Sequence, residues 1–362
     1  MAESIDCEDA SSLVSVSRNE RARIAQNTLA TLQTGWYELP DGQRVNLEDD
    51  VKFCNDNSIL YTEDDLQNMK KSISTTDESD VISYPKIEIR YCTTLQAARF
   101  LVAEVGEDHV GVLNFASAKN PGGGFLKGSQ AQEESIARSS SLYLAETQSR
   151  FMNGYYDYNR HGPRGIYSHR MIYSPRVTVF KDDNGKLLSS PYHVAIVTAP
   201  APNAGVIKNA KEARNVMTER VKHVLNVFKT NKHDTLVLGA YGCGVFKNDP
   251  LDVAIIFRQH LESKEFQHSF KRIIFAILNK EMYQIFEQVF GANDLNTIHE
   301  QIATLSLDHG VQKQSTKNNQ NKQNKKKGVE KRRRNNHFDE DQNQITDNDD
   351  ERRFDIDALF TI

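Results

Sequence analysis

The sequence is poor in cysteine and tryptophan, with four cysteines and one tryptophan in 362 residues. Cys7, Cys54, Cys92 and Cys243 lie far apart and form no CxxC pair. Zinc cages and disulfide frameworks need closely spaced or paired cysteines. The sequence therefore favours a protein of a reducing compartment that is built without either of them.

Long apolar runs are also missing from the sequence. No stretch approaches the roughly 18 consecutive apolar residues of a membrane-spanning helix. The acidic start, MAESIDCEDASS, has no apolar run of the kind found in secretory signals. We therefore expect neither a secretory signal nor a membrane partner.

The charge is unevenly distributed, although the net charge is only -4. Residues 311–334 carry ten Lys or Arg and one acid, whereas residues 335–362 carry nine acids and two Arg. The remainder of the chain is acidic. An acidic body disfavours direct nucleic-acid binding by the folded core.

Apolar periodicity divides the chain into four segments. Residues 1–17 and 306–362 hold too few apolar residues to bury a core, so both are expected to be disordered. Residues 18–83 read as a helix followed by a hairpin, which together form an N-terminal extension. Residues 84–305 alternate strands with helices, which favours an α/β sheet covered by helices on both faces. Within them, residues 151–190 are expected to form a loop with short strands.

The basic run KKKGVEKRRR (325–334) is typical of a nuclear localisation signal. The alternative is a solvated tail whose basic and acidic halves attract each other. The first interpretation predicts a protein of the nucleus as well as the cytoplasm. Neither interpretation identifies a partner for the tail.

A glycine-rich loop follows the buried strand VGVLNFA (110–116). It contains Gly122, Gly123 and Gly124, each of which costs about 1 kcal/mol in a helix interior relative to alanine. Such residues suit a sharp turn that a ligand approaches closely, and their N–H groups can face phosphate oxygens. A plain flexible turn is the alternative. The loop is not a Walker A motif, because Lys127 is followed by Gly128.

Two adjacent acids, Glu133 and Glu134, follow this loop at the expected start of a helix. Acids are common there for helix-dipole reasons alone. Beside a diphosphate-binding loop, however, a carboxyl group can supply the acid and base of glycoside hydrolysis. Neighbouring helical residues point about 100° apart. One glutamate can therefore face the scissile bond while the other binds a ribose hydroxyl.

A second glycine-rich loop occurs in LVLGAYGCGVFKNDP, again after a predicted strand. Its backbone amides can surround the other side of a diphosphate, and Phe246 can stack on a sugar or base. The alternative is a tight strand-to-helix connection with a core phenylalanine. Both loops follow strands of the expected sheet, which is where ligands bind in open α/β folds.

The histidines do not suggest a metal site. His161, His169 and His193 are isolated in the sequence, and each is interpreted as a surface or core residue. We expect neither a metal nor a cofactor.

These blocks resemble poly(ADP-ribose) glycohydrolases, and LNFASAKNPGGGF, QEE and GAYGCGVFKNDP are similar to the microbial-type branch over roughly residues 18–295. The resemblance implies a macrodomain, in which a mixed sheet between helices binds ADP-ribose in a cleft. It implies Glu134 as the catalytic acid and base, with Glu133 holding ribose hydroxyls. Around the substrate it places Asn114, Ala116, Asn120, Gly122, Gly123, Gly124, Gln132, Gly239, Gly242, Cys243, Gly244, Val245 and Phe246.

The implied activity is hydrolysis of ribose–ribose bonds, with cleavage at the chain end expected. The implied partners are poly(ADP-ribose) and ADP-ribosylated proteins. Three alternatives remain open: an ADP-ribose reader without turnover, a hydrolase of a related ADP-ribose linkage, and a scaffold whose charged tail carries the function.

Overall fold

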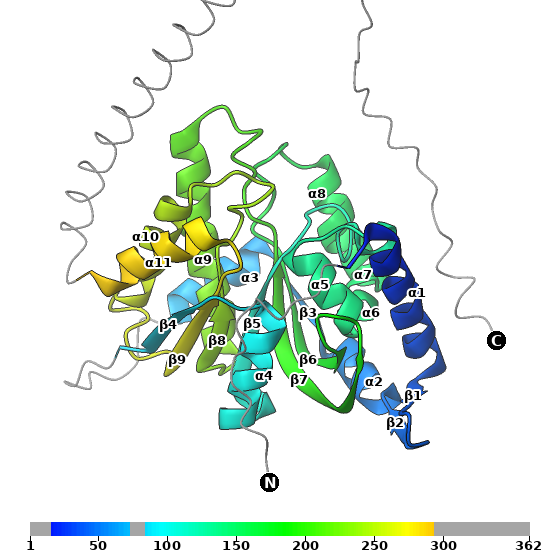
Figure 1. Cartoon of the computed structure of the whole chain (residues 1–362). Helices are drawn as coiled ribbons and strands as arrows, with labels where there is room; N and C mark the ends of the chain where they lie inside the picture. Colours follow the sequence, from blue (N-terminus) through cyan, green and yellow to red (C-terminus); the bar gives the residue numbers. More distant parts are fainter. Residues whose placement is uncertain (1–15, 73–83, 293–362) are drawn as a thin grey trace, which may run out of the picture. The chain divides into compact units, whose positions relative to one another are not determined.

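A seven-stranded mixed sheet forms the centre of the computed structural model, which describes residues 16–72 and 84–292 (Figure 1). In spatial order its strands are β3 (Ile59–Tyr61), β6 (Met171–Lys181), β7 (Leu187–Ala199), β5 (Val110–Phe115), β8 (Thr235–Leu238), β9 (Arg272–Ala276) and β4 (Lys86–Arg90). Strands β7 to β4 in this order pair in parallel, whereas β3 and β6 pair antiparallel. This confirms the predicted mixed α/β sheet.

Helices cover both faces of the sheet. Helices α4 (Thr94–Val105), α5 (Gln132–Ser139) and α6 (Leu142–Glu146) share a core with alternate residues of the central strands. Helices α9 (Ala210–Thr230) and α10 (Pro250–Leu261) cover the opposite face, together with α11 (Lys280–Gly291). A Cβ on Gly111 of β5 would meet the Phe228 ring of α9 at 2.6 Å, so α9 lies directly against the sheet.

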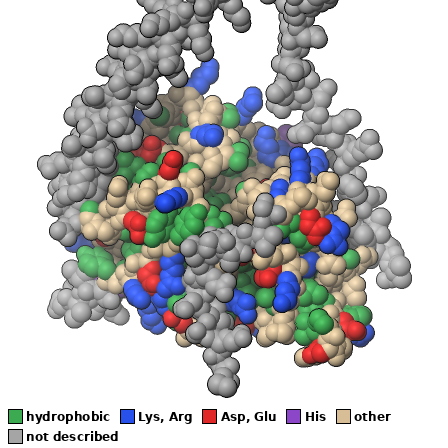
Figure 2. All heavy atoms as spheres, in the orientation of Figure 1, with side chains coloured by type: hydrophobic (Ala, Val, Ile, Leu, Met, Phe, Trp, Pro, Cys, Tyr) green, Lys and Arg blue, Asp and Glu red, His purple; other side chains and the backbone are tan. Residues whose placement is uncertain are grey.

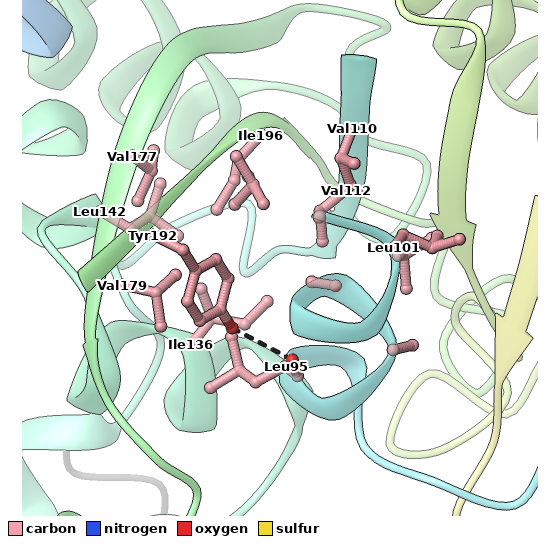
Figure 3. Close-up of a cluster of buried hydrophobic side chains, with 14 of the residues drawn as sticks. Leu95, Leu101, Val110, Val112, Ile136, Leu142, Val177, Val179, Tyr192 and Ile196 are labelled. Carbon is pink, nitrogen blue, oxygen red and sulfur yellow. Dashed lines mark hydrogen bonds between the residues drawn. The ribbon is translucent and has the colours of Figure 1, made fainter. Parts of the chain in front are cut away.

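The larger core is shown in Figure 3. Leu101, Val110 and Val112 are buried there, and each such side chain stabilises the fold by about 1.5–3 kcal/mol. The Tyr192 hydroxyl satisfies its polar atom by donating to the Leu95 carbonyl at 3.0 Å. Among the described residues, no helix has both the length and the apolarity that crossing a membrane requires.

The N-terminal segment packs against the sheet and also extends it. Helix α1 (Arg18–Thr34) is capped by Ser17 and ends at Gly35, whose φ is 80°. Strands β1 (Trp36–Glu38) and β2 (Arg44–Asn46) form the predicted hairpin. Helices α2 (Glu48–Asn57) and α3 (Glu63–Ser72) then flank β3, an edge strand that the sequence pattern did not predict.

The prediction of a mostly irregular 151–190 segment was wrong. It contains the end of α7 (Ser149–Phe151), the π-helix η5 (Met152–Asp157), α8 (Tyr158–His161) and most of the hairpin of β6 and β7. Strand β6 is buried along most of its length, so it lacks the alternation of a half-exposed strand. Pro175 also argues against a strand when only the sequence is considered. In the structure it falls at the register shift between Ser174 and Val177, where proline is tolerated.

Two short 3₁₀ turns complete the described elements, η3 (Glu107–His109) and η4 (Phe125–Lys127). The described residues all fall within one compact unit, Met1–His299. Residues 1–15, the expected tail over 306–362 and its basic run at 325–334 lie outside the described residues.

Candidate active site

The two glycine-rich loops lie at the same edge of the sheet. One follows β5 and the other follows β8, and these two strands are parallel neighbours. Their carboxyl ends therefore open onto one side of the molecule, as the sequence predicted. Figure 2 shows a hollow in the upper half of the displayed face, with Lys and Arg side chains around it.

The glycine turn after β5 depends on left-handed backbone. Gly122 and Gly123 have φ values of +61° and +60°. All three glycine N–H groups donate to protein acceptors: Gly122 to Glu146 Oε2 at 2.9 Å, Gly123 to the Asn120 carbonyl at 3.0 Å, and Gly124 to Glu134 Oε1 at 3.0 Å. In this structure the turn therefore holds carboxylates, although its amides were expected to face phosphate oxygens.

Gly123 is required because two carboxyl groups close on it. A Cβ at this position would lie 2.5 Å from Glu134 Oε1 and 2.8 Å from Glu133 Oε2, so both carboxyl groups would have to move to admit it. The consecutive glutamates at the start of α5 thus converge on one point of the turn. The first turn of α5 has no side-chain cap, since Ala131 occupies the N-cap.

Glu133 and Glu134 differ in environment. Glu133 is 4% exposed, and its Oε2 accepts from the Ser117 N–H at 2.8 Å. Its Oε1 has no hydrogen-bond partner within the described residues. Burial, followed by the negative charge of Glu146, raises the pKa of Glu133 well above its ordinary value. Glu134, by contrast, is partly exposed.

Gln132 holds the start of α5 against the end of β5. Its Oε1 accepts from the Phe115 N–H at 2.9 Å, and its Nε2 donates to the Leu113 carbonyl at 2.8 Å. Both ends of the amide are thereby used by the backbone of β5. The structure thus gives Gln132 a scaffold role beside its expected place in the site.

Glu146 is the main residue that sequence reasoning missed. It ends α6, is 0% exposed, and its Oε1 accepts from Thr198 Oγ1 at 2.8 Å and from Asn114 Nδ2 at 3.2 Å. Burial raises its pKa to about 7, although its hydrogen bonds with Thr198 and Gly122 oppose the shift. No local pattern marks this residue, because only the fold brings α6, β5, β7 and the glycine turn together.

Three other expected site residues occupy contrasting places. Ala116 is 1% exposed, and its N–H donates to the Ala199 carbonyl at 3.2 Å, so it continues the pairing of β5 with β7. Asn120 is exposed at the start of the glycine turn. Asn114 is fully buried, and its side chain meets Thr198 of the neighbouring strand.

The loop after β8 presents backbone donors. The N–H groups of Gly242, Gly244, Val245 and Phe246 donate no hydrogen bond within residues 16–72 and 84–292. Gly242 has a φ of +72°, and Val245 is 78% exposed. Successive unsatisfied amides in such a turn are suited to binding phosphate oxygens.

The other members of this loop support its backbone. A Cβ on Gly239 would lie 2.7 Å from the Ala276 carbonyl, so only glycine fits between β8 and β9. Cys243 is buried, its thiol contacts the Tyr241 carbonyl at 3.6 Å, and burial raises the pKa of this thiol. The thiol is therefore poorly suited to act as a nucleophile.

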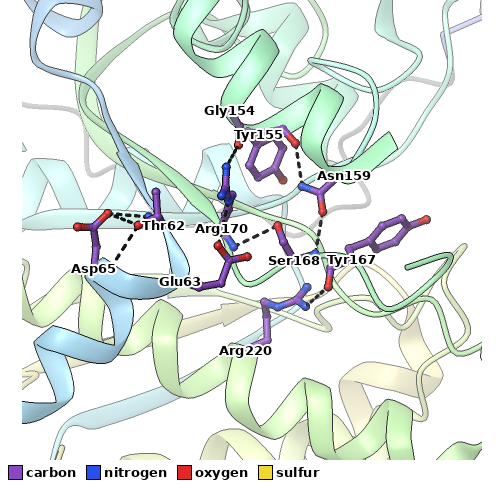
Figure 4. Close-up of polar contacts among 10 residues, drawn as sticks. All are labelled: Thr62, Glu63, Asp65, Gly154, Tyr155, Asn159, Tyr167, Ser168, Arg170 and Arg220. Carbon is purple, nitrogen blue, oxygen red and sulfur yellow. Dashed lines mark hydrogen bonds and ion pairs between the residues drawn. The ribbon is translucent and has the colours of Figure 1, made fainter. Parts of the chain in front are cut away.

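Phe246 packs against Tyr167, a second aromatic residue that the sequence did not indicate. The ring centroids are 5.9 Å apart, and Tyr167 has a φ of +56°. Buried Arg220 helps to hold this residue by donating to the carbonyls of Ile166 and Tyr167 at 3.1 and 3.3 Å. The Tyr167 contact is drawn in Figure 4.

The same network fixes the π-helix η5 (Figure 4). Arg170 donates to the Gly154 carbonyl at 2.7 Å and to Glu63 at the start of α3 at 2.9 Å. Asn159 donates to the Tyr155 carbonyl at 2.9 Å and accepts from the Ser168 N–H at 2.7 Å. π-Helical turns are frequent at functional sites. Here the turn buries Tyr155 and Tyr156 beside the carboxyl groups of the site.

The histidines are distributed over separate environments. His161 is exposed, His169 accepts from the Arg220 guanidinium at 3.0 Å, and His193 contacts Glu107 at 2.8 Å. Within the part of the chain that the structure describes, no three His, Cys, Asp or Glu side chains gather as a potential metal site.

A carboxyl pair and unsatisfied amide donors, on neighbouring loops at the carboxyl edge of a helix-covered sheet, are suited to a glycoside hydrolase that handles a phosphorylated sugar. The class of protein is thus an O-glycosyl hydrolase with a macrodomain-like fold.

Comparison with known proteins supports this class. Residues 25–182 match the family model of the catalytic domain of microbial-type PARG, or poly(ADP-ribose) glycohydrolase. The solved poly(ADP-ribose) glycohydrolase of Thermomonospora curvata is 37% identical with a TM-score of 0.70, and the match covers 75% of this chain and 99% of that one. No curated protein sequence matches the chain.

Two ligand complexes are also similar to this chain. The T. curvata enzyme bound to the inhibitor ADP-HPD has 37% identity and a TM-score of 0.68, over 75% of this chain and 99% of that one. The Deinococcus radiodurans enzyme in complex with ADP-ribose has 35% identity and a TM-score of 0.61, over 70% and 98%. The chain belongs to the microbial-type poly(ADP-ribose) glycohydrolase family.

Proposed function

We propose that this enzyme releases ADP-ribose from poly(ADP-ribose) by general acid–base catalysis at Glu134, without a metal. One observation carries the proposal: two consecutive glutamates converge on a glycine turn in different environments, Glu133 buried and Glu134 accessible. Unequal environments allow two carboxyl groups to take different roles. The substrate follows from the family and from the relatives that bind ADP-ribose or ADP-HPD.

The reaction breaks the bond between the anomeric carbon of the terminal ADP-ribose and the oxygen of the next ribose. Glu134 in its acid form donates a proton to this departing oxygen as the carbon develops oxocarbenium character. The resulting carboxylate then takes a proton from the water that attacks the anomeric carbon. Glu134 is thereby returned to its acid form, and the two products are free ADP-ribose and a shortened polymer.

Binding is assigned to the remaining parts of the site. The N–H groups of residues 242 and 244–246 contact the diphosphate, while Phe246 orients the terminal ribose with Tyr167 behind it. Glu133 binds ribose hydroxyls, and Asn120 lines the rim of the cleft. Holding the diphosphate places the anomeric carbon beside Glu134, which lowers the entropic part of the barrier.

Glu134→Gln tests the proposal, because it preserves the shape of the side chain and removes its acid and base. The purified variant should bind ADP-ribose like the wild type in calorimetry but release no ADP-ribose from automodified polymer. Glu212→Gln, an exposed change in the first turn of α9, is the matched control and should retain turnover. Wild-type turnover by Glu134→Gln would remove Glu134 from its assigned role.

Chromatography of the products also settles the mode of cleavage. Free ADP-ribose from the earliest time points supports the proposed release from chain ends. Short oligomers at the same time points would indicate internal cleavage. Binding of the polymer by the wild type without any product would favour a reader of ADP-ribose instead.

We also propose that the basic run at 325–334 directs nuclear import. Its support is its sequence alone, since it lies outside the described residues. A fluorescent reporter fused to residues 311–362 should accumulate in nuclei, and replacing the seven basic residues of the run with alanine should abolish this accumulation.

A further inference from the structure

Glu146 is a buried carboxyl group that the proposed chemistry does not use. A charge or an unpaired polar group in a protein interior is costly unless it is hydrogen-bonded. Glu146 is 0% exposed and accepts three hydrogen bonds, one each from Gly122, Thr198 and Asn114. The fold thus supplies three donors to a carboxyl group that is fully removed from water, which indicates that its position is structurally specified.

These contacts tie the turn below the catalytic pair to the sheet. Gly122 begins the turn whose next residue, Gly123, touches both Glu133 and Glu134, and whose Gly124 donates to Glu134. Asn114 lies at the carboxyl end of β5. Thr198 is its registered partner on β7. One carboxyl group thus joins α6, two strands and the turn that receives the catalytic pair.

We propose that Glu146 is a positioning residue of the hydrolysis: by accepting from the Gly122 N–H it anchors the glycine turn that contacts Glu133 and Glu134. In its ionised form it also opposes ionisation of Glu133. A protonated Glu133 then has an O–H to donate on the ribose side of the site, where an ionised carboxylate has none. The proposal rests on the proposed roles of Glu133 and Glu134.

The hydrogen bonds decide which carboxyl group carries the charge. Two buried carboxyl groups in electrostatic contact cannot both ionise easily, so they share one charge near neutral pH. Glu146 accepts from three donors, which favours its ionised form. Glu133 has fewer donors: the Ser117 N–H donates to it at 2.8 Å, and Asn114 makes a smaller contribution. Burial and then the charge of Glu146 raise the pKa of Glu133.

The other titratable groups around Glu146 do not neutralise it. Glu134 adds a second acidic group from α5, and its charge also raises the pKa of Glu133. Burial and then the charge of Glu146 raise the pKa of Tyr156 on η5 and of Tyr143 on α6. Tyr155 on η5 is buried with a raised pKa as well. These phenols are therefore neutral at working pH and add no positive charge beside Glu146, which leaves the negative charge of this cluster to its carboxyl groups.

Two variants separate the effect of the negative charge of Glu146 from the effect of its side-chain length. Glu146→Gln keeps the size of the side chain but removes the charge and turns one acceptor into a donor. We expect kcat to fall on the order of 10- to 100-fold, as a slightly displaced turn would produce. We also expect the alkaline limb of the kcat/KM profile to move to lower pH, because Glu133 loses its proton more easily.

Glu146→Asp keeps the charge but is one methylene shorter, so it cannot reach Gly122 and Thr198 together. Its kcat should fall while the position of the alkaline limb stays that of the wild type. Glu281→Gln, an exposed change in the first turn of α11, is the control and should alter neither property. A role confined to stability would lower the melting temperature of both Glu146 variants without moving the pH profile.

The outcomes distinguish this inference from the function itself. If the wild type and Glu281→Gln release ADP-ribose, and Glu146→Gln retains both kcat and pH profile, the inference is overturned and the function stands. A wild type that releases no ADP-ribose would instead overturn the function. If Glu146→Gln does not fold, a second experiment takes its place: infrared difference spectra between the wild type and Glu133→Gln, recorded at neutral pH. A protonated-carboxyl band that disappears with Glu133 is expected, and its absence overturns the inference.

Discussion

Replacing Gly123 with alanine should damage catalysis far more than stability. Gly123 has a φ of +60°, a conformation that costs an alanine about 1–2 kcal/mol. The new methyl group would lie 2.5 Å from Glu134 Oε1, whereas ordinary contacts begin at 3.4 Å. The carboxylate must therefore move by about 1 Å. A shift of that size can cost about 100-fold in rate.

The backbone cost has a matched control in the hairpin between β1 and β2. Gly42 has a φ of +84°, and a Cβ there would meet nothing within 4 Å. Gly42→Ala therefore carries the same kind of strain without moving a catalytic group. Both variants should lose a few degrees of melting temperature, at about 2–4 °C per kcal/mol for domains of 150–250 residues.

The assay is release of ADP-ribose from automodified polymer, with kcat and KM measured separately. Gly42→Ala should retain wild-type kcat, while Gly123→Ala should lose about 100-fold, equivalent to about 2.7 kcal/mol of transition-state stabilisation. If Gly123→Ala keeps kcat within about threefold of the wild type, then the placement of Glu134 by this turn is not what limits the reaction, and the reasoning is wrong.

Two further predictions concern pH and the tail. The pKa of Glu133 is raised in the folded state. The folded protein therefore loses stability as the pH rises above the ordinary pKa of a glutamate, by about 1.4 kcal/mol per pH unit until the raised pKa is reached. Glu133→Gln should therefore raise the melting temperature of the unliganded protein near pH 8 while impairing turnover, and a melting curve below the wild type would contradict this. Deleting residues 311–362 should leave kcat unchanged in the polymer assay and abolish nuclear accumulation, so a large loss of kcat would assign the tail a catalytic role.

Local patterns account for much of the framework. The spacing of apolar residues and the cap at Ser17 predicted α1, and the alternation in KIEIR predicted β4. Proline-aspartate-glycine chemistry predicted the β1–β2 hairpin. These features depend on neighbours in the chain, so they can be read from the chain. Strand β6 could not, because its burial on both faces removes the alternation that marks a strand.

The sequence also predicted most of the residues that form the candidate site. Three consecutive glycines after one strand, a glutamate pair, and a second glycine loop after another strand together resemble one enzyme family. Their meeting at one edge follows from the parallel pairing of β5 with β8. The use of the amides did not follow from the sequence. The amides of Gly122 and Gly124 bind carboxylates, whereas those of residues 242 and 244–246 in the second loop have no acceptor among the described residues.

The sequence by itself thus determined the α/β framework, the two loops and the glutamate pair, because each is specified by residues close together in the chain. Only the tertiary structure decided the electrostatics of the site. Glu146 lies 24 residues from Gly122 and 52 from Thr198 in sequence, yet it accepts a hydrogen bond from each. Removal from water and proximity to another carboxyl group shift a pKa, and both are properties of the packed interior. They exist only once the chain has folded.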